Sequence, residues 1–373
     1  MTRCPEADRG RSLELSLRKL LLLLLPGMLS LGACTRALPP LGGSPVEAYQ
    51  GRVLVASAQG VIYALDPKAR EKNIPFPAQG EWVFPQDKRK LGTFYASPLV
   101  AEDRVYVGSY EGQLLALDGV SGQPPGEGVL LKGAAMVGSP VLEGEVLYVA
   151  SGPKLLALDP LTGQPRWSFS ARDRIWATPL VAGDTVYVAS LDHRLYALNA
   201  ADGSLLWSFQ AKWAVTSSPA AGGESLYLAA FDGLYRLDAK TGQALWPQPF
   251  RAGGWFWGSP LWWEDKVFAG SMDGNLYALN ASSGQSLWKF DTGAPILASP
   301  VLEGALVVAS NRVYGLDPSS GRALWSRPEI GPVVADLRAQ DGVVYVHGKD
   351  AQDTLWALRG ATGEVLWSFP LKG

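Results

Sequence analysis

The chain has 373 residues, of which 47% are hydrophobic and 10% are aromatic. This content is ample for a packed core and excludes a disordered protein. The formal net charge of −2 at pH 7 argues against a nucleic-acid binder, because such proteins are normally basic.

The N-terminal residues have the pattern of an export signal. Arg18 and Lys19 precede an apolar run at 20–31 that is too short to span a bilayer. The run ends in "LGAC", which resembles the lipobox of bacterial lipoproteins, where the cysteine sulfur carries a diacylglyceryl group. We therefore expect residues 1–33 to be a lipoprotein signal peptide and Cys34 to be the lipidated mature N-terminus. An ordinary signal peptide with an incidental cysteine is the alternative.

The two cysteines leave no disulfide in the mature protein. Cys4 lies in the leader, and Cys34 would be consumed by the lipid. The exported protein must then be stabilised by burial alone. Residues 34–43 contain "ALPPLGG", whose proline and glycine content predicts a tether rather than a domain.

An internal repeat runs through the rest of the chain. Eight segments resemble "ALD", and successive copies are separated by 37 to 52 residues. Such a period is typical of a four-stranded propeller blade. The segments are centred on Leu65, Leu117, Leu158, Leu198, Leu237, Leu279, Leu316 and Leu358.

Each period contains four short apolar runs separated by turn residues. In one period they are a Ser/Thr-Pro segment, "DTVYVAS" at 184–190, "RLYALN" at 194–199 and "LLWSF" at 205–209. The runs are apolar nearly throughout, as expected when both faces of a blade are covered by its neighbours. We predict that residues 44–373 form an all-β, eight-bladed β-propeller of four-stranded antiparallel blades.

The third and fourth runs are joined by a turn of fixed length in most blades. Asp or Asn opens the turn and can accept hydrogen bonds from its amides, and glycine supplies the positive φ angle. Six of the turns place a tryptophan eight residues after the Asp, Asn or Arg. We expect these rings, together with Trp82, to be structural and to lie between adjacent blades. This motif comprises Trp82, Trp167, Trp207, Trp246, Trp288, Trp325 and Trp367.

These "lYALD…tGxxlW" units resemble the repeats of pyrroloquinoline-quinone (PQQ)-type propellers. The family includes quinoprotein alcohol dehydrogenases and the propeller lipoprotein of the outer-membrane β-barrel assembly machinery. The resemblance covers residues 44–373 and implies the fold, but it is shared by an enzyme class and a scaffold class. No "GH…WD" signature of a WD40 propeller is present.

Three blades depart from the repeat. The first has the insertion "PKAREKNIPFPAQGEW" in place of the short turn, and the second has "QPPGEGVLL" where tryptophan is expected. The eighth lacks the Ser-Pro and has Arg359 in place of Asp. Atypical terminal units are expected where a ring closes. With Ser44-Pro45 beginning the first blade and Trp367 on the last strand, we predict closure without a blade split between the termini.

The sequence offers no convincing catalytic or metal site. By the resemblance, a quinoprotein dehydrogenase would need a calcium-holding cluster, an Asp base and usually an adjacent cysteine pair, which this chain lacks. Without a cysteine pair a C-x-x-C-H haem motif is excluded, and with only His193 and His347 a multi-histidine metal site is not expected. We therefore predict no catalytic residue, metal or cofactor. Residues that could by type bind a hard cation, but are explained equally well as turn residues, are Asp273, Asn275, Asp350 and Asp353.

The connections between blades carry most of the sequence variety. They open on the face opposite the glycine turns and contain extra tryptophans with several basic residues. Aromatic and arginine side chains are common interface anchors. We expect a partner-binding face there; the alternative, that the rings fill the central channel, stays open. Its candidate residues are Phe94, Tyr95, Arg172, Arg174, Trp176, Lys212, Trp213, Arg251, Trp255 and Trp257.

These observations predict a non-catalytic, lipid-anchored, monomeric propeller that binds an envelope protein or peptide. By the resemblance, a role in outer-membrane protein assembly is implied. The alternative is a PQQ-dependent oxidoreductase with an atypical pocket. Anchoring to the outer membrane facing the periplasm, or to the outer face of the cytoplasmic membrane, would both follow from a lipidated Cys34.

Overall fold

A computed structural model describes residues 46–86, 91–126, 128–350 and 352–371. All of them belong to the second of the two units into which the chain divides, Gly42–Gly373. The predicted signal peptide at 1–33, lipidation at Cys34, tether at 34–43 and first strand at Ser44-Pro45 lie outside the described residues. No helix in the described part of the chain is long and apolar enough to cross a membrane.

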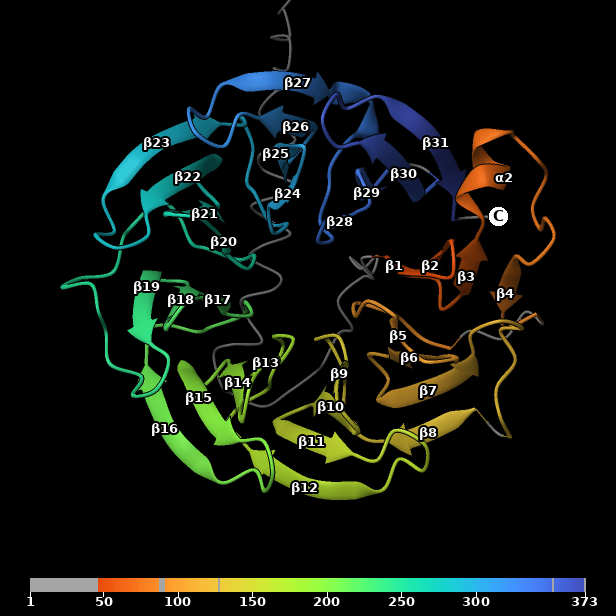
Figure 1. The fold of residues 1–373 in the computed structure, drawn as a ribbon, viewed down its shortest axis with the longest axis horizontal. Coiled ribbons are helices and arrows are strands. Elements are labelled where there is room, and N and C mark those ends of the chain that lie inside the picture. Colours follow the sequence, from red (N-terminus) through yellow and green to blue (C-terminus); the bar gives the residue numbers. More distant parts are fainter. Residues whose placement is uncertain (1–45, 87–90, 127, 351, 372–373) are drawn as a thin grey trace, which may run out of the picture. The chain divides into compact units, whose positions relative to one another are not determined.

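The described residues of the second unit form eight antiparallel sheets that follow one another around a ring (Figure 1). Each sheet is built from consecutive strands, so each sheet is one blade. Blade 1 contains β1 (Glu47–Tyr49), β2 (Arg52–Ala56), β3 (Ile62–Leu65) and β4 (Trp82–Phe84), and blade 2 contains β5 (Leu99–Ala101), β6 (Arg104–Gly108), β7 (Gln113–Asp118) and β8 (Val129–Lys132). Blade 3 contains β9 (Val141–Glu143), β10 (Val146–Ser151), β11 (Lys154–Leu158) and β12 (Pro165–Ser170), and blade 4 contains β13 (Leu180–Ala182), β14 (Thr185–Ser190), β15 (Arg194–Asn199) and β16 (Leu205–Gln210).

The second half of the ring continues the same order. Blade 5 contains β17 (Ala220–Gly222), β18 (Ser225–Ala230) and β19 (Gly233–Asp238), and blade 6 contains β20 (Leu261–Trp263), β21 (Lys266–Gly270), β22 (Asn275–Asn280) and β23 (Ser286–Asp291). Blade 7 contains β24 (Val301–Glu303), β25 (Ala305–Ala309), β26 (Val313–Leu316) and β27 (Ala323–Arg327), and blade 8 contains β28 (Arg338–Gln340), β29 (Val343–Gly348), β30 (Thr354–Arg359) and β31 (Val365–Pro370). Within the described residues, helix is limited to α2 (Pro67–Glu71) and the 3-10 turn η1 (Pro328–Ile330). The predicted all-β, eight-bladed propeller is confirmed.

The hydrophobic core lies between blades rather than within one of them. One buried cluster joins Leu195 and Ala197 of β15 to Leu226 and Leu228 of β18 in the next blade. Strand β18 is buried along its whole length. Both faces of such a strand are covered, which explains the apolar runs without alternation.

The motif tryptophans join neighbouring blades through the glycine turns. The indole of Trp167 in blade 3 lies against Gly203 in the turn of blade 4, where a Cβ would overlap the ring. Its Nε1 donates a hydrogen bond of 2.9 Å to the carbonyl of Ala200 in the same turn. Gly203 has a φ of 72°, so the position requires glycine for both backbone and space. The same ring-on-glycine contact is made by Trp82 with Gly122, Trp207 with Gly242, Trp246 with Gly284, Trp288 with Gly321 and Trp325 with Gly363.

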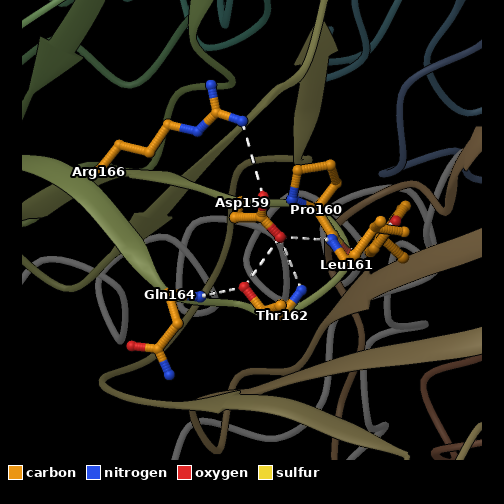
Figure 2. Close-up of polar contacts among 7 residues, drawn as sticks. Asp159, Pro160, Leu161, Thr162, Gln164 and Arg166 are labelled. Atoms are coloured by element: carbon orange, nitrogen blue, oxygen red, sulfur yellow. Dashed lines mark hydrogen bonds and ion pairs between the residues drawn. The ribbon is translucent and has the colours of Figure 1, made fainter.

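The Asp or Asn side chain that opens most of the glycine turns fixes their conformation. Figure 2 shows Asp159, whose carboxylate accepts hydrogen bonds from the amides of Leu161 and Thr162 and from the Thr162 hydroxyl, at 3.0, 2.8 and 2.8 Å. The bonds from the Thr162 amide and hydroxyl lower the pKa of Asp159, because they favour its charged form. The turn therefore presents a fixed glycine to the incoming indole.

A second set of contacts between blades explains the Ser/Thr-Pro segments. The backbone amide of Ser97 donates to the hydroxyl of Ser139 in the next blade at 2.8 Å, and Ser139 repeats this with Thr178 at 2.9 Å. In blade 8, Asp336 replaces the hydroxyl residue and still accepts from the Ser299 amide at 2.7 Å. Blade 8 therefore keeps a hydrogen-bond acceptor at this position although it lacks the Ser-Pro sequence. Further links of this kind join Ser218 to Ser259 and Ser259 to Ser299.

The ring closes between two complete sheets, as predicted. The insertion of blade 1 forms α2, which packs on β31 of blade 8. Arg70 of α2 forms a buried ion pair of 2.9 Å with Glu81, and its guanidinium lies 5.6 Å from the ring of Phe369. Phe76 also packs against Phe369. At this junction the insertion takes the place of a glycine turn.

Two blades differ from the predicted four-strand pattern or its packing. In blade 5 the fourth segment forms no continuous strand and pairs with β19 only through the isolated bridges Leu237–Ala244 and Leu234–Phe250. Pro247 and Pro249 follow Trp246, and proline cannot donate to a strand ladder. Trp246 is nevertheless buried, with only 4% of its surface exposed. In blade 2, Leu130 lies against Gly163 and fills the place of the missing tryptophan.

We predict that Trp246→Ala lowers the free energy of unfolding by about 3–5 kcal/mol, because it removes a buried ring from the contact between blades. Leu287→Ala, which changes a side chain that is 47% exposed, is the control and should stay within about 0.5 kcal/mol of the parent. Chemical denaturation monitored by circular dichroism measures both. Equal stabilities of the two variants would contradict the role assigned to the indole.

Candidate functional site

The direction of the strands separates two sets of loops. In an antiparallel blade, the turns between strands 2 and 3 open on the same side as the connections to the next blade. We call this side the inter-blade face. The turns between strands 1 and 2 open on the opposite side with the glycine turns, and we call it the glycine-turn face.

The connections approach each new blade with a regular pattern. Four residues before the proline, or the equivalent residue of blade 8, a large side chain is buried between blades. Phe94 occupies this place in blade 2 and is 0% exposed. It packs in a core cluster with Trp82 and Val107, so its assignment to the partner-binding face is wrong. The equivalent residues, exposed by at most 1%, are Met136, Ile175, Val215, Phe256, Ile296 and Val333.

The next position in the pattern brings two tryptophans together across one blade. Trp176 leads into blade 4 and Trp257 into blade 6, and their ring centroids are 6.4 Å apart. The equivalent residue of blade 5 is the smaller Thr216, whose hydroxyl donates to the carbonyl of Trp257 at 3.2 Å. Both rings are half-buried. The guanidinium of Arg174 lies over Trp176, 5.3 Å from the ring centre.

Phe231 extends this group to a continuous aromatic cluster. Its ring stacks on Trp255 at 5.3 Å with an interplanar angle of 10°, and on Trp257 at 5.7 Å and 23°. Phe231 was not among the residues predicted from sequence. It occupies the turn between strands 2 and 3 of blade 5, where blade 4 has Leu191, and only this alignment could have identified it. We define the aromatic cluster as Arg174, Trp176, Phe231, Trp255 and Trp257.

Trp213 is the most exposed tryptophan of the predicted face. It lies in the connection from blade 4 to blade 5, and 55% of its surface is exposed. Arg172, Lys212 and Arg251 are also exposed on three successive connections. Tyr95 is half-buried on blade 2, and its ring packs against Tyr110 at 5.4 Å. The predicted residues thus divide into one buried residue, Phe94, an aromatic cluster over blades 4 to 6, and exposed side chains beside it.

Carboxylates in the turns between strands 2 and 3 fix these connections in place. Asp192 accepts from the Arg172 amide at 2.8 Å, and Asp232 accepts from the Trp213 amide at 3.2 Å. Asp273 does the same for Gly253 at 2.7 Å. Each carboxylate also accepts a hydrogen bond from a tyrosine hydroxyl. The donors to Asp192, Asp232 and Asp273 are Tyr196, Tyr235 and Tyr277, respectively. These aspartates orient the loops that carry the exposed side chains.

The pKa values agree with this role of Asp273. Burial works to raise its pKa, but the hydrogen bonds from Tyr277, Asn275 and the Gly253 amide outweigh burial and lower the pKa. Burial and the neighbouring Asp273 raise the pKa of Tyr277 to about 12. Asp273 is therefore ionised at neutral pH and accepts hydrogen bonds, which accounts for the "MDGN" turn without a cation.

The other candidates for cation binding also make contacts within the protein. Asp350 accepts hydrogen bonds from the amide and hydroxyl of Thr354 at 3.1 and 2.7 Å. Asp353 lies 3.5 Å from His347, measured between Oδ1 and Nε2. In the described part of the chain, no three His, Cys, Asp or Glu side chains are grouped as a metal site requires.

The chain is similar in sequence to an outer-membrane assembly factor and, over shorter stretches, to two dehydrogenases. The family model described as outer membrane protein assembly factor BamB matches residues 130–246, 230–329 and 300–372. A quinoprotein ethanol dehydrogenase of Pseudomonas putida is 35% identical over 74 residues, which are 18% of this chain and 11% of that enzyme. A polyvinylalcohol dehydrogenase of Sphingopyxis sp. (strain 113P3) is 26% identical over 164 residues, which are 38% of this chain and 20% of the enzyme. The chain therefore spans only a small part of the length of these two enzymes.

Solved structures share the fold at low sequence identity. BamB from Moraxella catarrhalis superposes with a TM-score of 0.65 at 18% identity, over 86% of this chain and 92% of that chain. The computationally designed Ika8 protein superposes with a TM-score of 0.67 at 16% identity, over 89% of this chain and 97% of its own. These likenesses concern the fold alone. Because the family model matches most of the chain, the resemblance predicted from the repeats is confirmed, and the chain belongs to the family of outer membrane protein assembly factor BamB.

Proposed function

We propose that the protein is a non-catalytic scaffold that holds an envelope protein on its inter-blade face during outer-membrane protein assembly. The observation that carries the proposal is the exposed Trp213 beside the aromatic cluster and three cationic connections, on a propeller of the BamB family. Aromatic and arginine side chains are enriched among the residues that dominate binding energy. The monomeric propeller needs no second copy to present them.

The difference between the two faces supports this choice of surface. The glycine-turn face is built from nearly the same turn in most blades, so it offers little to distinguish one partner from another. The inter-blade face carries different side chains in each blade, and hydrogen bonds to Asp192, Asp232 and Asp273 hold three of its loops in position. A fixed surface loses little conformational entropy on binding.

We further propose that Cys34 carries lipid and anchors the protein to the outer membrane, facing the periplasm. The "LGAC" segment after an apolar run supports the modification. Membership of the BamB family supports the outer membrane as its location.

A quinone-dependent oxidoreductase is the second candidate function. The local matches to the ethanol and polyvinylalcohol dehydrogenases favour it. Those matches cover only 18% and 38% of this chain, and this chain lacks the adjacent cysteine pair that the enzyme resemblance implies. Mixing the purified protein with PQQ and Ca²⁺ decides the matter: bound quinone absorbance or dye-linked alcohol oxidation would support the enzyme.

We predict that the double variant Arg174→Ala with Trp213→Ala weakens partner binding at least tenfold, because the two anchors together contribute more than about 1.4 kcal/mol. In cells lacking the native gene, this variant should fail to restore the level of outer-membrane β-barrel proteins. Leu206→Ala with Lys240→Ala is the matched control, since it removes an exposed apolar residue and a cation from the other side of the molecule. Full complementation by the first variant, at equal protein level, would reject the proposed face.

Replacing Cys34 tests the anchor separately. A single acyl chain holds a protein only marginally, whereas the lipoprotein modification supplies two or more chains. We expect Cys34→Ser to move the protein from the membrane fraction to the soluble periplasmic fraction, with its fold unchanged by circular dichroism. Unaltered partitioning into the detergent phase would exclude lipid at this cysteine.

A further inference from the structure

The chain enters the propeller on the inter-blade face. Strand β1 (Glu47–Tyr49) follows the first described residue, Val46, leads to the turn at Gln50 and Gly51, and pairs antiparallel with β2. That turn joins strands 1 and 2, so it lies on the glycine-turn face. Val46 therefore lies at the opposite end of the innermost strand, on the same side as Trp213.

The length of chain between Cys34 and Val46 limits how far a lipid at Cys34 can lie from each face of the propeller. These twelve steps reach ~40 Å when fully extended and ~20 Å on average as a flexible chain. A route around the outside must cross four strands spaced ~4.8 Å apart and then descend a strand of six residues at ~3.3 Å each. This route alone uses nearly the full extended length. The segment between Cys34 and Val46 can therefore place a lipid beside the inter-blade face without being stretched. To place it beside the glycine-turn face, the segment must be almost fully extended.

The two faces also differ in their exposed charged side chains. Exposed carboxylates occupy the turns between strands 1 and 2 in six blades, and Lys240 and Lys266 pair with two of them. On the inter-blade face the exposed charges are of both signs, because Arg172, Lys212 and Arg251 are exposed together with Asp173, Asp291 and Glu329. Asp192, Asp232 and Asp273 accept hydrogen bonds from tyrosines there. An anionic membrane surface attracts basic segments and repels acidic ones. The six carboxylates belong to Asp103, Glu145, Asp184, Glu224, Asp265 and Asp341.

We infer that the propeller is held with its inter-blade face toward the membrane and its glycine-turn face toward the periplasmic space. The inference rests on the lipid anchor of the proposed function. It specifies the kind of partner: a protein captured beside Trp213 lies within the reach of the tether from the bilayer. Such a partner is the membrane-proximal part of a protein that is itself inserted in, or anchored to, the same membrane.

Single thiols on the two faces test this orientation. With Cys34 modified by lipid and Cys4 in the leader, the mature chain has no other cysteine. Ser170→Cys places a fluorescent label at the end of β12 on the inter-blade face, and Ser319→Cys places it in the glycine turn of blade 7. Both positions are exposed serines. The lipidated protein is reconstituted into vesicles that contain a headgroup-linked nitroxide quencher.

We expect quenching to be several-fold stronger at position 170 than at position 319, with a larger ratio in vesicles of anionic lipid than in neutral ones. Vesicle flotation is measured on the same samples. Equal quenching, or stronger quenching at position 319, in protein that floats would overturn the orientation while leaving the anchor intact. Protein that does not float would reject the anchor itself, and the orientation with it.

Discussion

The ring depends on the contact between an indole and the glycine turn of the next blade. The turn must bend through a positive φ angle and must also leave space where a Cβ would lie, as Gly203 does beneath Trp167. Asp159 fixes its turn by accepting hydrogen bonds from two amides and a hydroxyl. Because the same contact recurs between blades, the propeller gains its stability from many similar interfaces instead of one central core.

This construction assigns different tasks to the two faces. Turns that receive an indole cannot vary without loss of packing, so the glycine-turn side repeats the same structure. The connections between blades need only one buried side chain, such as Phe94 or Ile175, and a short residue to accept a hydrogen bond. The remaining positions are free to carry side chains such as Trp213. Binding residues can therefore accumulate on that face at little cost to the fold.

The periodic parts of the structure could be predicted from sequence, and the irregular parts could not. Spacing and turn chemistry were enough for the eight blades and for the position of the motif tryptophans. Phe94 was misassigned because an aromatic residue in a variable loop does not reveal burial unless the connections are aligned. Phe231 was missed because it lies in a different turn and joins the cluster only in three dimensions. The packing of α2 on β31 depends on a contact between the two ends of the propeller, which no local pattern contains.

The central claim is that the inter-blade face holds a membrane-associated partner while the glycine-turn side does not. Photo-cross-linking in cells of the native host tests it most directly, with a photoreactive amino acid at position 213 in one variant and at position 206 in the other. Both native side chains are more than half exposed, at 55% and 51%, so access to the probe is matched. The account predicts a discrete adduct with an outer-membrane assembly protein from position 213 alone. The same adduct from position 206 with none from position 213 would contradict it.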